Sequence, residues 1–277
     1  MPWHAQLQLH YTHDGHGTGA LDRHEGPLRV LRRLYPEGPG ICHHVLVHPP
    51  GGIVGGDVLA LDAQLDRGSH ALITTPGATR FYRSAGALAE QRVHARMDEG
   101  ARLEWLPLET IAYDACLARN RLCFDLAPSA EMIGWDVLAL GLPAAGQAFE
   151  QGTFQQELEL PRAWLERGRV DATDTRLLDS PLGWAGRRVL ATMWFAGGAA
   201  LRPARRDALL EAARTQVAHH AALASHAGAT ALQERVVVLR ALADRVEPAM
   251  QLLLRVWTAW RSIAWGLGAT PPRVWRT

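Results

Sequence analysis

The chain has 277 residues, 48% of them hydrophobic, and its 29 basic residues nearly balance its 28 acidic residues. This apolar fraction is sufficient to bury a large core in one or two domains. The near-neutral charge excludes the basic excess typical of proteins that bind nucleic acid or anionic membrane surfaces, so we expect neither as a partner.

The cysteines and the start of the chain indicate a cytoplasmic protein. Cys42, Cys116 and Cys123 are odd in number and lack CxxC spacing, which favours reduced thiols over a disulfide framework or a zinc ribbon. The segment Met1–Ala5 shows no signal-peptide pattern, and no run of eighteen apolar residues predicts a membrane span.

Candidate strands recur at regular intervals through the first two hundred residues, separated by Gly, Pro, Asp and Asn. In chain order they are Trp3–Tyr11, Arg29–Leu34, Cys42–His48, Val58–Leu65, His70–Thr75, Glu90–Met97, Ala101–Leu106, Arg121–Leu126, Glu131–Leu140, Thr153–Leu160, Glu166–Val170 and Arg188–Phe195. This spacing predicts a mainly β sandwich, barrel or solenoid. No strict repeat identifies a regular β-helix, which leaves an irregular winding open.

Helical periodicity comes late, in Arg205–Ser225 and Met250–Trp265. Between these helices Leu232–Leu239 has the pattern of a strand, and Pro271–Trp275 is expected to close the chain extended. No linker divides the sequence, so we expect one domain over residues 1–277. Its β part would cover about 1–200 and 229–240, and its helical part about 203–226 and 248–266.

A bend rich in glycine and proline, His48–Leu59, lies between two candidate strands. Its glycine spacing, Gly51-Gly52-x-x-Gly55-Gly56, is not that of a dinucleotide-binding turn, and no helix pattern follows it. A P-loop needs a lysine, which this chain lacks altogether. The bend is therefore predicted to be a loop between strands and not a phosphate cradle.

The best-spaced candidate metal ligands are Cys42, His44 and His48, which would share one face of a strand. His43 and His44 would face opposite sides, so this adjacent pair does not chelate one ion. The alternative interpretation is a buried cysteine beside hydrogen-bonded histidines.

A polar turn follows the strand at residues 70–75. It contains Thr74, Thr75, Arg80, Tyr82 and Arg83. If buried, its two arginines need carboxylate partners. The candidate partners are Asp57, Glu104, Glu109 and Asp136. Such a lining could hold a hydrated cation or present a recognition surface, and a plain hydrogen-bonded turn is the alternative.

Glu104 and Glu109 lie close in the sequence and are candidates for general acid–base catalysis. They form a weak pair, because a proline separates them and they need not share a face. Neither GxSxG nor HExxH occurs. A hydrolase on a β fold that uses these two glutamates therefore stays open only as an alternative function.

Four segments together resemble the UreD (UreH) family of urease accessory proteins. They are Pro49–Asp57, Thr74–Pro76 with Tyr82–Ser84, Leu103–Pro107 with Glu109–Ile111, and Pro272–Trp275. Their order and intervals also match, and the likeness runs from about Gly26 to the C-terminus.

The resemblance implies an irregular β-helix, solenoid-like fold with a small helical part, and a non-catalytic role in nickel insertion into urease. It implies binding to apo-urease and to UreF, which recruits the GTPase UreG, and no tightly bound cofactor. It also implies a tunnel for transient Ni²⁺. Weak ligands along that path would be Asp57, Glu104, Glu109, Asp136, Cys42, His44 and His48, and candidate partner contacts would be Thr74, Thr75, Arg80, Tyr82 and Arg83.

The sequence departs from the family pattern at three positions: Arg80 replaces a usual lysine, Leu142 a usual arginine, and Gln147 a usual glutamate. Loss of both charges at 142 and 147 would remove an ion pair without leaving one charge buried alone. Late in the chain, Trp257, Trp260 and Trp265 could form either an apolar partner contact or a core stripe. A purely structural scaffold is a third possible function.

Overall fold

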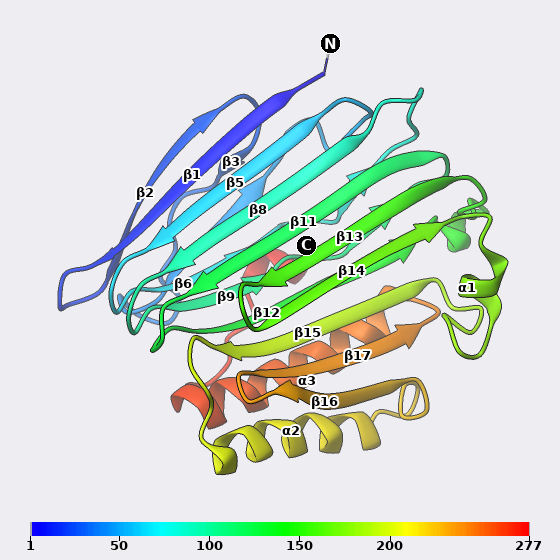
Figure 1. Cartoon of the computed structure of the whole chain (residues 1–277). Helices are drawn as coiled ribbons and strands as arrows, with labels where there is room; N and C mark the ends of the chain where they lie inside the picture. Colours follow the sequence, from blue (N-terminus) through cyan, green and yellow to red (C-terminus); the bar gives the residue numbers. More distant parts are fainter. Residues whose placement is uncertain (1, 277) are drawn as a thin grey trace.

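The computed structural model describes residues 2–276 and shows two stacked β-sheets with helices packed beneath one of them (Figure 1). The first sheet has seven strands. In spatial order these are β14 (Trp164–Asp171), β13 (Gly152–Leu160), β11 (Cys116–Leu126), β8 (Ala89–Met97), β5 (Val58–Leu65), β1 (His4–His13) and β2 (Thr18–Glu25).

The second sheet has ten strands. Its main path runs β16 (Ala227–Gln233), β17 (Val236–Ala243), β15 (Val189–Gly197), β12 (Glu131–Leu140), β9 (Arg102–Leu106), β6 (His70–Thr74), β4 (Cys42–Val47) and β3 (Arg29–Val30). Off this path, β10 (Thr110–Ala112) pairs with β12 and with β7 (Thr79–Phe81).

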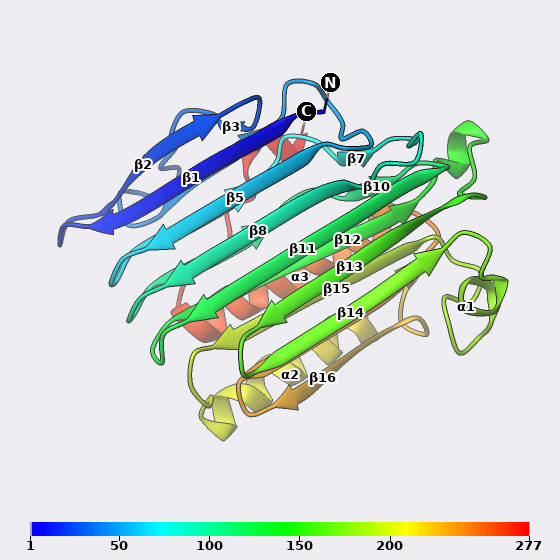
Figure 2. The ribbon, with the colours of Figure 1, turned by 45° about the horizontal axis from the view of Figure 1, so that its top comes forward.

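The chain alternates between the two sheets, so that β5, β8, β11 and β13 of the first sheet interleave along the sequence with β6, β9 and β12 of the second. Neighbouring strands within each of these series are parallel. Figure 2 shows this winding, with the helices on the far side of the second sheet. The predicted mainly β, solenoid-like fold is confirmed.

Alternating side chains fill the space between the sheets. In β1, residues Ala5, Leu7, Leu9 and Tyr11 are buried, whereas the polar residues between them are exposed. The same period of two holds in β5 and β11, because successive side chains of a strand point to opposite faces. One apolar core therefore lies between the sheets, and the outer face of the seven-stranded sheet is polar.

A second core lies between the ten-stranded sheet and the helices α2 (Pro203–Ala218) and α3 (Val246–Trp265). Strand β12 is covered on both faces, which is why every residue after Glu131 is buried and its sequence reads as a continuous apolar run. Trp257 and Trp260 are fully buried in this core. Of the two interpretations of these tryptophans, the structure supports the core stripe.

Three short helical segments complete the described chain: η1 (Pro143–Ala145), α1 (Thr175–Asp179) and η2 (Arg273–Arg276). Within residues 2–276, no helix is long and apolar enough to cross a bilayer.

Several predicted bounds were wrong. The strand predicted at 29–34 is reduced to β3, and the helix predicted at 205–225 ends at Ala218. The strand predicted at 232–239 spans the turn between β16 and β17, and the extended C-terminal segment contains η2. This last error has a structural cause: Trp275 turns inward to contact Trp135 and Trp257, with ring centroids 5.6 and 6.0 Å away.

Candidate functional site

The glycine-rich bend is held by one buried carboxylate. Asp57 is 1% exposed and accepts hydrogen bonds from the backbone N–H groups of Trp3, at 2.7 Å, and Val54, at 3.0 Å. At Gly52, a Cβ atom would lie 2.0 Å from the ring of Tyr82, so only glycine fits there. Asp57, a predicted path residue, thus fixes the shape of the bend.

A pocket of roughly 370 Å³ opens beside this bend, and we refer to it as the bend pocket. Its lining comprises Leu28, Leu46, Val47, His48, Pro49, Gly51, Gly52, Ile53, Leu59, Thr75, Pro76, Gly77, Ala78, Thr79, Arg80 and Gln91. Thr75 and Arg80 of the predicted polar turn therefore line one pocket with residues 48–53 of the predicted bend, whereas Thr74, Tyr82 and Arg83 do not.

The arginines of the polar turn do not need buried carboxylate partners, because Arg80 and Arg83 are both exposed. Arg83 Nη2 lies 3.6 Å from Asp114 Oδ2. Arg80 forms no ion pair within residues 2–276. Thr74 is buried and contacts the C-terminal segment: its Oγ1 donates to the Leu106 carbonyl at 2.6 Å and accepts from Trp275 Nε1 at 2.7 Å.

A line of polar side chains crosses the apolar space between the sheets. Gln91 Nε2 donates to Asn120 Oδ1 at 3.0 Å, and Asn120 Nδ2 donates to Asp136 Oδ1 at 3.1 Å. Asn120 is 1% exposed and Asp136 is 9% exposed. The line starts at the wall of the bend pocket and passes from β8 through β11 to β12, so it joins the two sheets.

The line ends in a second pocket, of roughly 210 Å³, which we call the edge pocket. Its lining comprises Asp136, Leu138, Gln156, Leu158, Glu166, Gly168, Arg169, Val170, Leu177, Trp184, Leu190 and Thr192. Burial raises the pKa of Asp136 to about 7, against hydrogen bonds from the Gln156 and Asn120 amides that lower it. Burial also raises the pKa of Glu166, although Arg240 opposes the shift. The carboxyl of Asp136 is therefore close to half-protonated near neutral pH.

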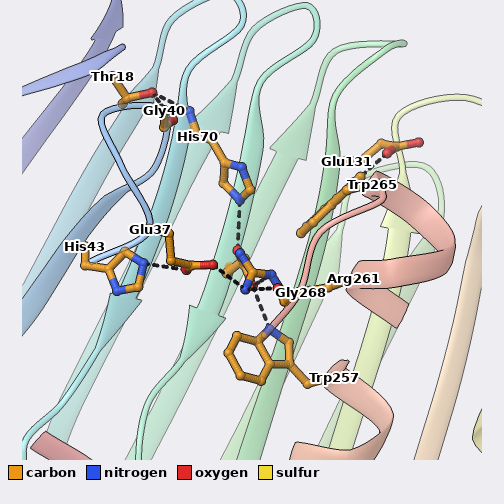
Figure 3. A network of polar contacts seen from close by, with 11 residues as sticks. Thr18, Glu37, Gly40, His43, His70, Glu131, Trp257, Arg261, Trp265 and Gly268 are labelled. Carbon is orange, nitrogen blue, oxygen red and sulfur yellow. Dashed lines mark hydrogen bonds and ion pairs between the residues drawn. The ribbon is translucent and has the colours of Figure 1, made fainter. Parts of the chain in front are cut away.

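Glu104 lies on the opposite face of the ten-stranded sheet from Asp136, in a buried network beneath α3. Figure 3 shows this network, with Trp257 and Arg261 of α3 turned toward His70 and Glu37. Its carboxylate is fully buried and accepts from Trp257 Nε1 at 2.6 Å, and it contacts His70 Nε2 at 2.8 Å. Arg261 Nε lies 3.3 Å from Glu104 Oε2. The structure therefore does not bring Glu104 and Asp136 together in one site.

Arg261 joins Glu104 to a second carboxylate. Its Nη1 donates to Glu37 Oε2 at 2.8 Å and to the Gly268 carbonyl at 2.6 Å, and Glu37 Oε1 contacts His43 Nε2 at 2.9 Å. Burial raises the pKa of Glu37, but the hydrogen bonds from His43 and Arg261 outweigh it and hold that pKa below its usual value. Because Arg261 is fully buried between two carboxylates, we call this group the α3 clamp.

The candidate ligands of β4 are also separated. His44 Nδ1 lies 2.8 Å from the hydroxyl of Tyr11, and burial lowers the pKa of His44 to about 4. Cys42 is buried, and burial raises the pKa of its thiol. His48 lines the bend pocket. Glu109 belongs to the segment that connects β9 to β10, and its side chain is half-buried. Among the described residues, no group of three or more His, Cys, Asp or Glu side chains is arranged to hold a metal ion.

Comparison with known proteins identifies the family. The UreD urease accessory protein family matches residues 4–276. The chain belongs to this family. It is 65% identical to the urease accessory protein UreD of Leptothrix cholodnii and 57% identical to that of Variovorax paradoxus, in both cases over the full length of both chains. It is 58% identical to the UreD of Methylibium petroleiphilum, again with full coverage of both.

Leu142 and Gln147, the two positions where we predict a paired departure from the family pattern, are neighbours. Leu142 N donates to the Gln147 carbonyl at 2.6 Å, and Gln147 N donates back to the Leu142 carbonyl at 3.1 Å. Both residues line a pocket with Tyr82 and Tyr113, whose tilted rings have centroids 4.9 Å apart. Positions 142 and 147 therefore share one backbone bridge, which is close enough for an arginine and a glutamate at these positions to pair.

Several residues of this UreD site were missed from the sequence: Gln91, Asn120, Gln156, Glu37 and Arg261. One signal was available for Asn120, which occupies an inward position of β11 between Ala118 and Leu122. A polar residue within such an apolar alternation indicates a buried polar contact. Nothing local marks Glu37 or Arg261, because they meet only through the tertiary fold.

Proposed function

We propose that this UreD protein is a non-catalytic cytoplasmic scaffold and nickel metallochaperone. It binds apo-urease and the UreF–UreG complex, and Ni²⁺ passes through its interior on the way to the urease active site. The family membership supports the accessory role. The partners and the path are the proposed part.

The main support for the proposed nickel path is the line of polar side chains between the bend pocket and the edge pocket. Gln91 lines the first pocket, Asp136 lines the second, and Asn120 bonds to both. Such a line is costly in an apolar core unless each member has a partner, and here the partners form a continuous series. Amide and carboxylate oxygens are able to replace part of the water shell of a divalent cation.

The path holds nickel only weakly, because a transfer route that bound the ion tightly would retain it. Ni²⁺ binds nitrogen, sulfur and oxygen ligands more strongly than most competing divalent ions do. Asp136 offers a carboxyl that is only part ionised near neutral pH, and the other members of the line are neutral amides. Calorimetric titration of the isolated chain with Ni²⁺ is expected to show weak binding or none, and a tight stoichiometric site would contradict the proposal.

Replacement of Asn120 by leucine tests the path. The leucine keeps similar volume but removes both hydrogen bonds of the line. We expect Asn120→Leu to reduce urease activation while apo-urease and UreF still copurify with the chain. The matched control is Gln6→Leu, on the exposed outer face of the same sheet, which should activate urease normally.

The purely structural scaffold predicts a different outcome, namely loss of activation only where partner binding is also lost. Full activation by Asn120→Leu would refute the path. The hydrolase alternative requires turnover by the purified chain. Burial of Glu104 beneath α3, with Trp257 and Arg261 around its carboxylate, leaves that residue no opening to a substrate, and we expect no turnover.

A further inference from the structure

The bend pocket has the construction of a binding site for an apolar side chain. Its deep wall is made by Leu46, Ile53 and Leu59, all less than 9% exposed, so the pocket reaches the end of the core between the sheets. Around it, Pro49 and Pro76 are exposed. Proline fixes the backbone, so this rim is rigid before any partner arrives.

The bend pocket is lined by one basic side chain and by no acidic side chain. The basic residue, Arg80, is exposed at the rim and forms no ion pair within residues 2–276. His48 also lines the pocket, and its buried Nε2 atom has no hydrogen-bond partner among the described residues. Burial lowers the pKa of His48, so this ring is neutral near pH 7 and is able to donate to or accept from a ligand.

We propose that the bend pocket docks a segment of a partner protein that presents an apolar side chain next to a carboxylate. The apolar side chain fills the space between Leu46 and Leu59, and the carboxylate pairs with Arg80. This inference deepens the proposed function, on which it rests for the existence of a protein partner.

The shape of the pocket favours a protein segment over a small amphiphile. Beside the apolar wall, the exposed Pro49 and Pro76 of the rim and the exposed Val54 of the bend, with 43% of its area accessible, offer more surface than a small amphiphile covers. A partner that covers these rims excludes water from the ion pair, which strengthens it. A seated segment also closes one end of the polar line, because Gln91 lies in the wall of the same pocket.

The test uses the purified full chain without nickel or urease, so its result does not depend on the nickel path. Capped tetrapeptides are titrated while backbone amide signals are followed by NMR. The probe has the sequence glycine–glutamate–leucine–glycine. Two controls replace glutamate by lysine or leucine by serine, and decanoate serves as the small amphiphile.

We expect the glutamate–leucine peptide to shift the signals of residues 48–53 and 75–80, with a dissociation constant on the order of 1 mM. Arg80→Glu should weaken this binding about fivefold, and salt should weaken it as well. The matched control is Arg83→Glu, three residues further on, which lines a different pocket and should bind like the wild type.

Four results would overturn the proposal. They are no shifts in these residues, shifts confined to another surface, equal binding of the lysine or serine peptide, and tighter binding of decanoate than of the peptide. Unchanged urease activation with normal nickel loading in a chain whose peptide binding is weakened by Arg80→Glu would leave the docking site standing but would separate it from urease maturation.

Discussion

Replacement of Arg261 by alanine is the most severe single change that we predict for the α3 clamp. The side chain of Arg261 is fully buried, with 0% of its surface accessible, and it lies between Glu37 and Glu104. Removing it leaves the buried carboxylate of Glu104 without its cation. Loss of one partner of a buried ion pair destabilises a protein by about 3–5 kcal/mol. The guanidinium also lies 5.1 Å from the Trp257 ring centroid, and that contact is lost too.

Urea unfolding followed by tryptophan fluorescence measures the effect. With a slope of about 3 kcal/mol per molar urea, the loss lowers the midpoint by about 1 to 1.7 M. The matched control is Arg255→Ala, on the exposed face of the same helix, which should stay within about 0.5 kcal/mol of the wild type.

A double replacement separates the lost ion pair from the lost packing. Because Glu104→Leu removes the stranded charge, we expect Glu104→Leu with Arg261→Leu to cost less than the sum of the single changes, by about 0.5–3 kcal/mol. Equal midpoints for Arg261→Ala and Arg255→Ala would refute the idea that the α3 clamp holds the helix on the sheet.

Three further predictions concern other parts of the fold. The pKa of Asp136 is raised from 3.8 to about 7, so its contribution to stability is present at low pH and is lost as the pH rises to about 7. Asp136→Asn should therefore flatten that part of the stability–pH curve, and an unchanged slope would contradict it. Burial raises the pKa of both Cys123 and Cys116, to about 12 for Cys116, and Cys116 is buried whereas Cys123 is half-buried. Mass spectrometry should therefore show alkylation of Cys123 first, and earlier modification of Cys116 would be incompatible with this packing. Leu142→Arg with Gln147→Glu should show a favourable double-mutant coupling of about 0.2–1 kcal/mol in urea unfolding, and zero coupling would show that the bridge does not juxtapose these side chains.

The sequence predicted best those strands that keep one burial pattern along their whole length, with either one face or both faces buried. Val58–Leu65 alternates and Glu131–Leu140 is apolar throughout, and both strands have the predicted bounds. The strand at Thr18–Glu25 was missed because most of its residues are exposed and polar at the edge of a sheet. An edge strand is stabilised by backbone pairing, here with β1, which leaves little trace in its side chains.

The site was less predictable than the fold. The sequence marked the polar turn and the glycine-rich bend as separate features, and the structure brings Thr75 and Arg80 of the turn into one pocket with the bend. The carboxylates could not be assigned to common or separate sites from the sequence, since Glu104 and Asp136 both lie on strands of one sheet and differ only in which face they occupy. The face to which a side chain points depends on how each strand pairs with its neighbours. The spacing of residues along the chain does not determine this for two separate strands.

The proposed passage of Ni²⁺ along the line from Gln91 to Asp136 requires an open edge pocket, so a side chain that narrows this pocket should block it. Gly168 lines the edge pocket, and no atom lies within 4 Å of the position that a Cβ atom would take there. The structure therefore accommodates Gly168→Leu, whose side chain narrows the edge pocket. The decisive measurement is the nickel content of urease after activation with this variant. We expect an assembled complex with nickel-poor urease, and nickel loading equal to that of the wild type would rule out this path.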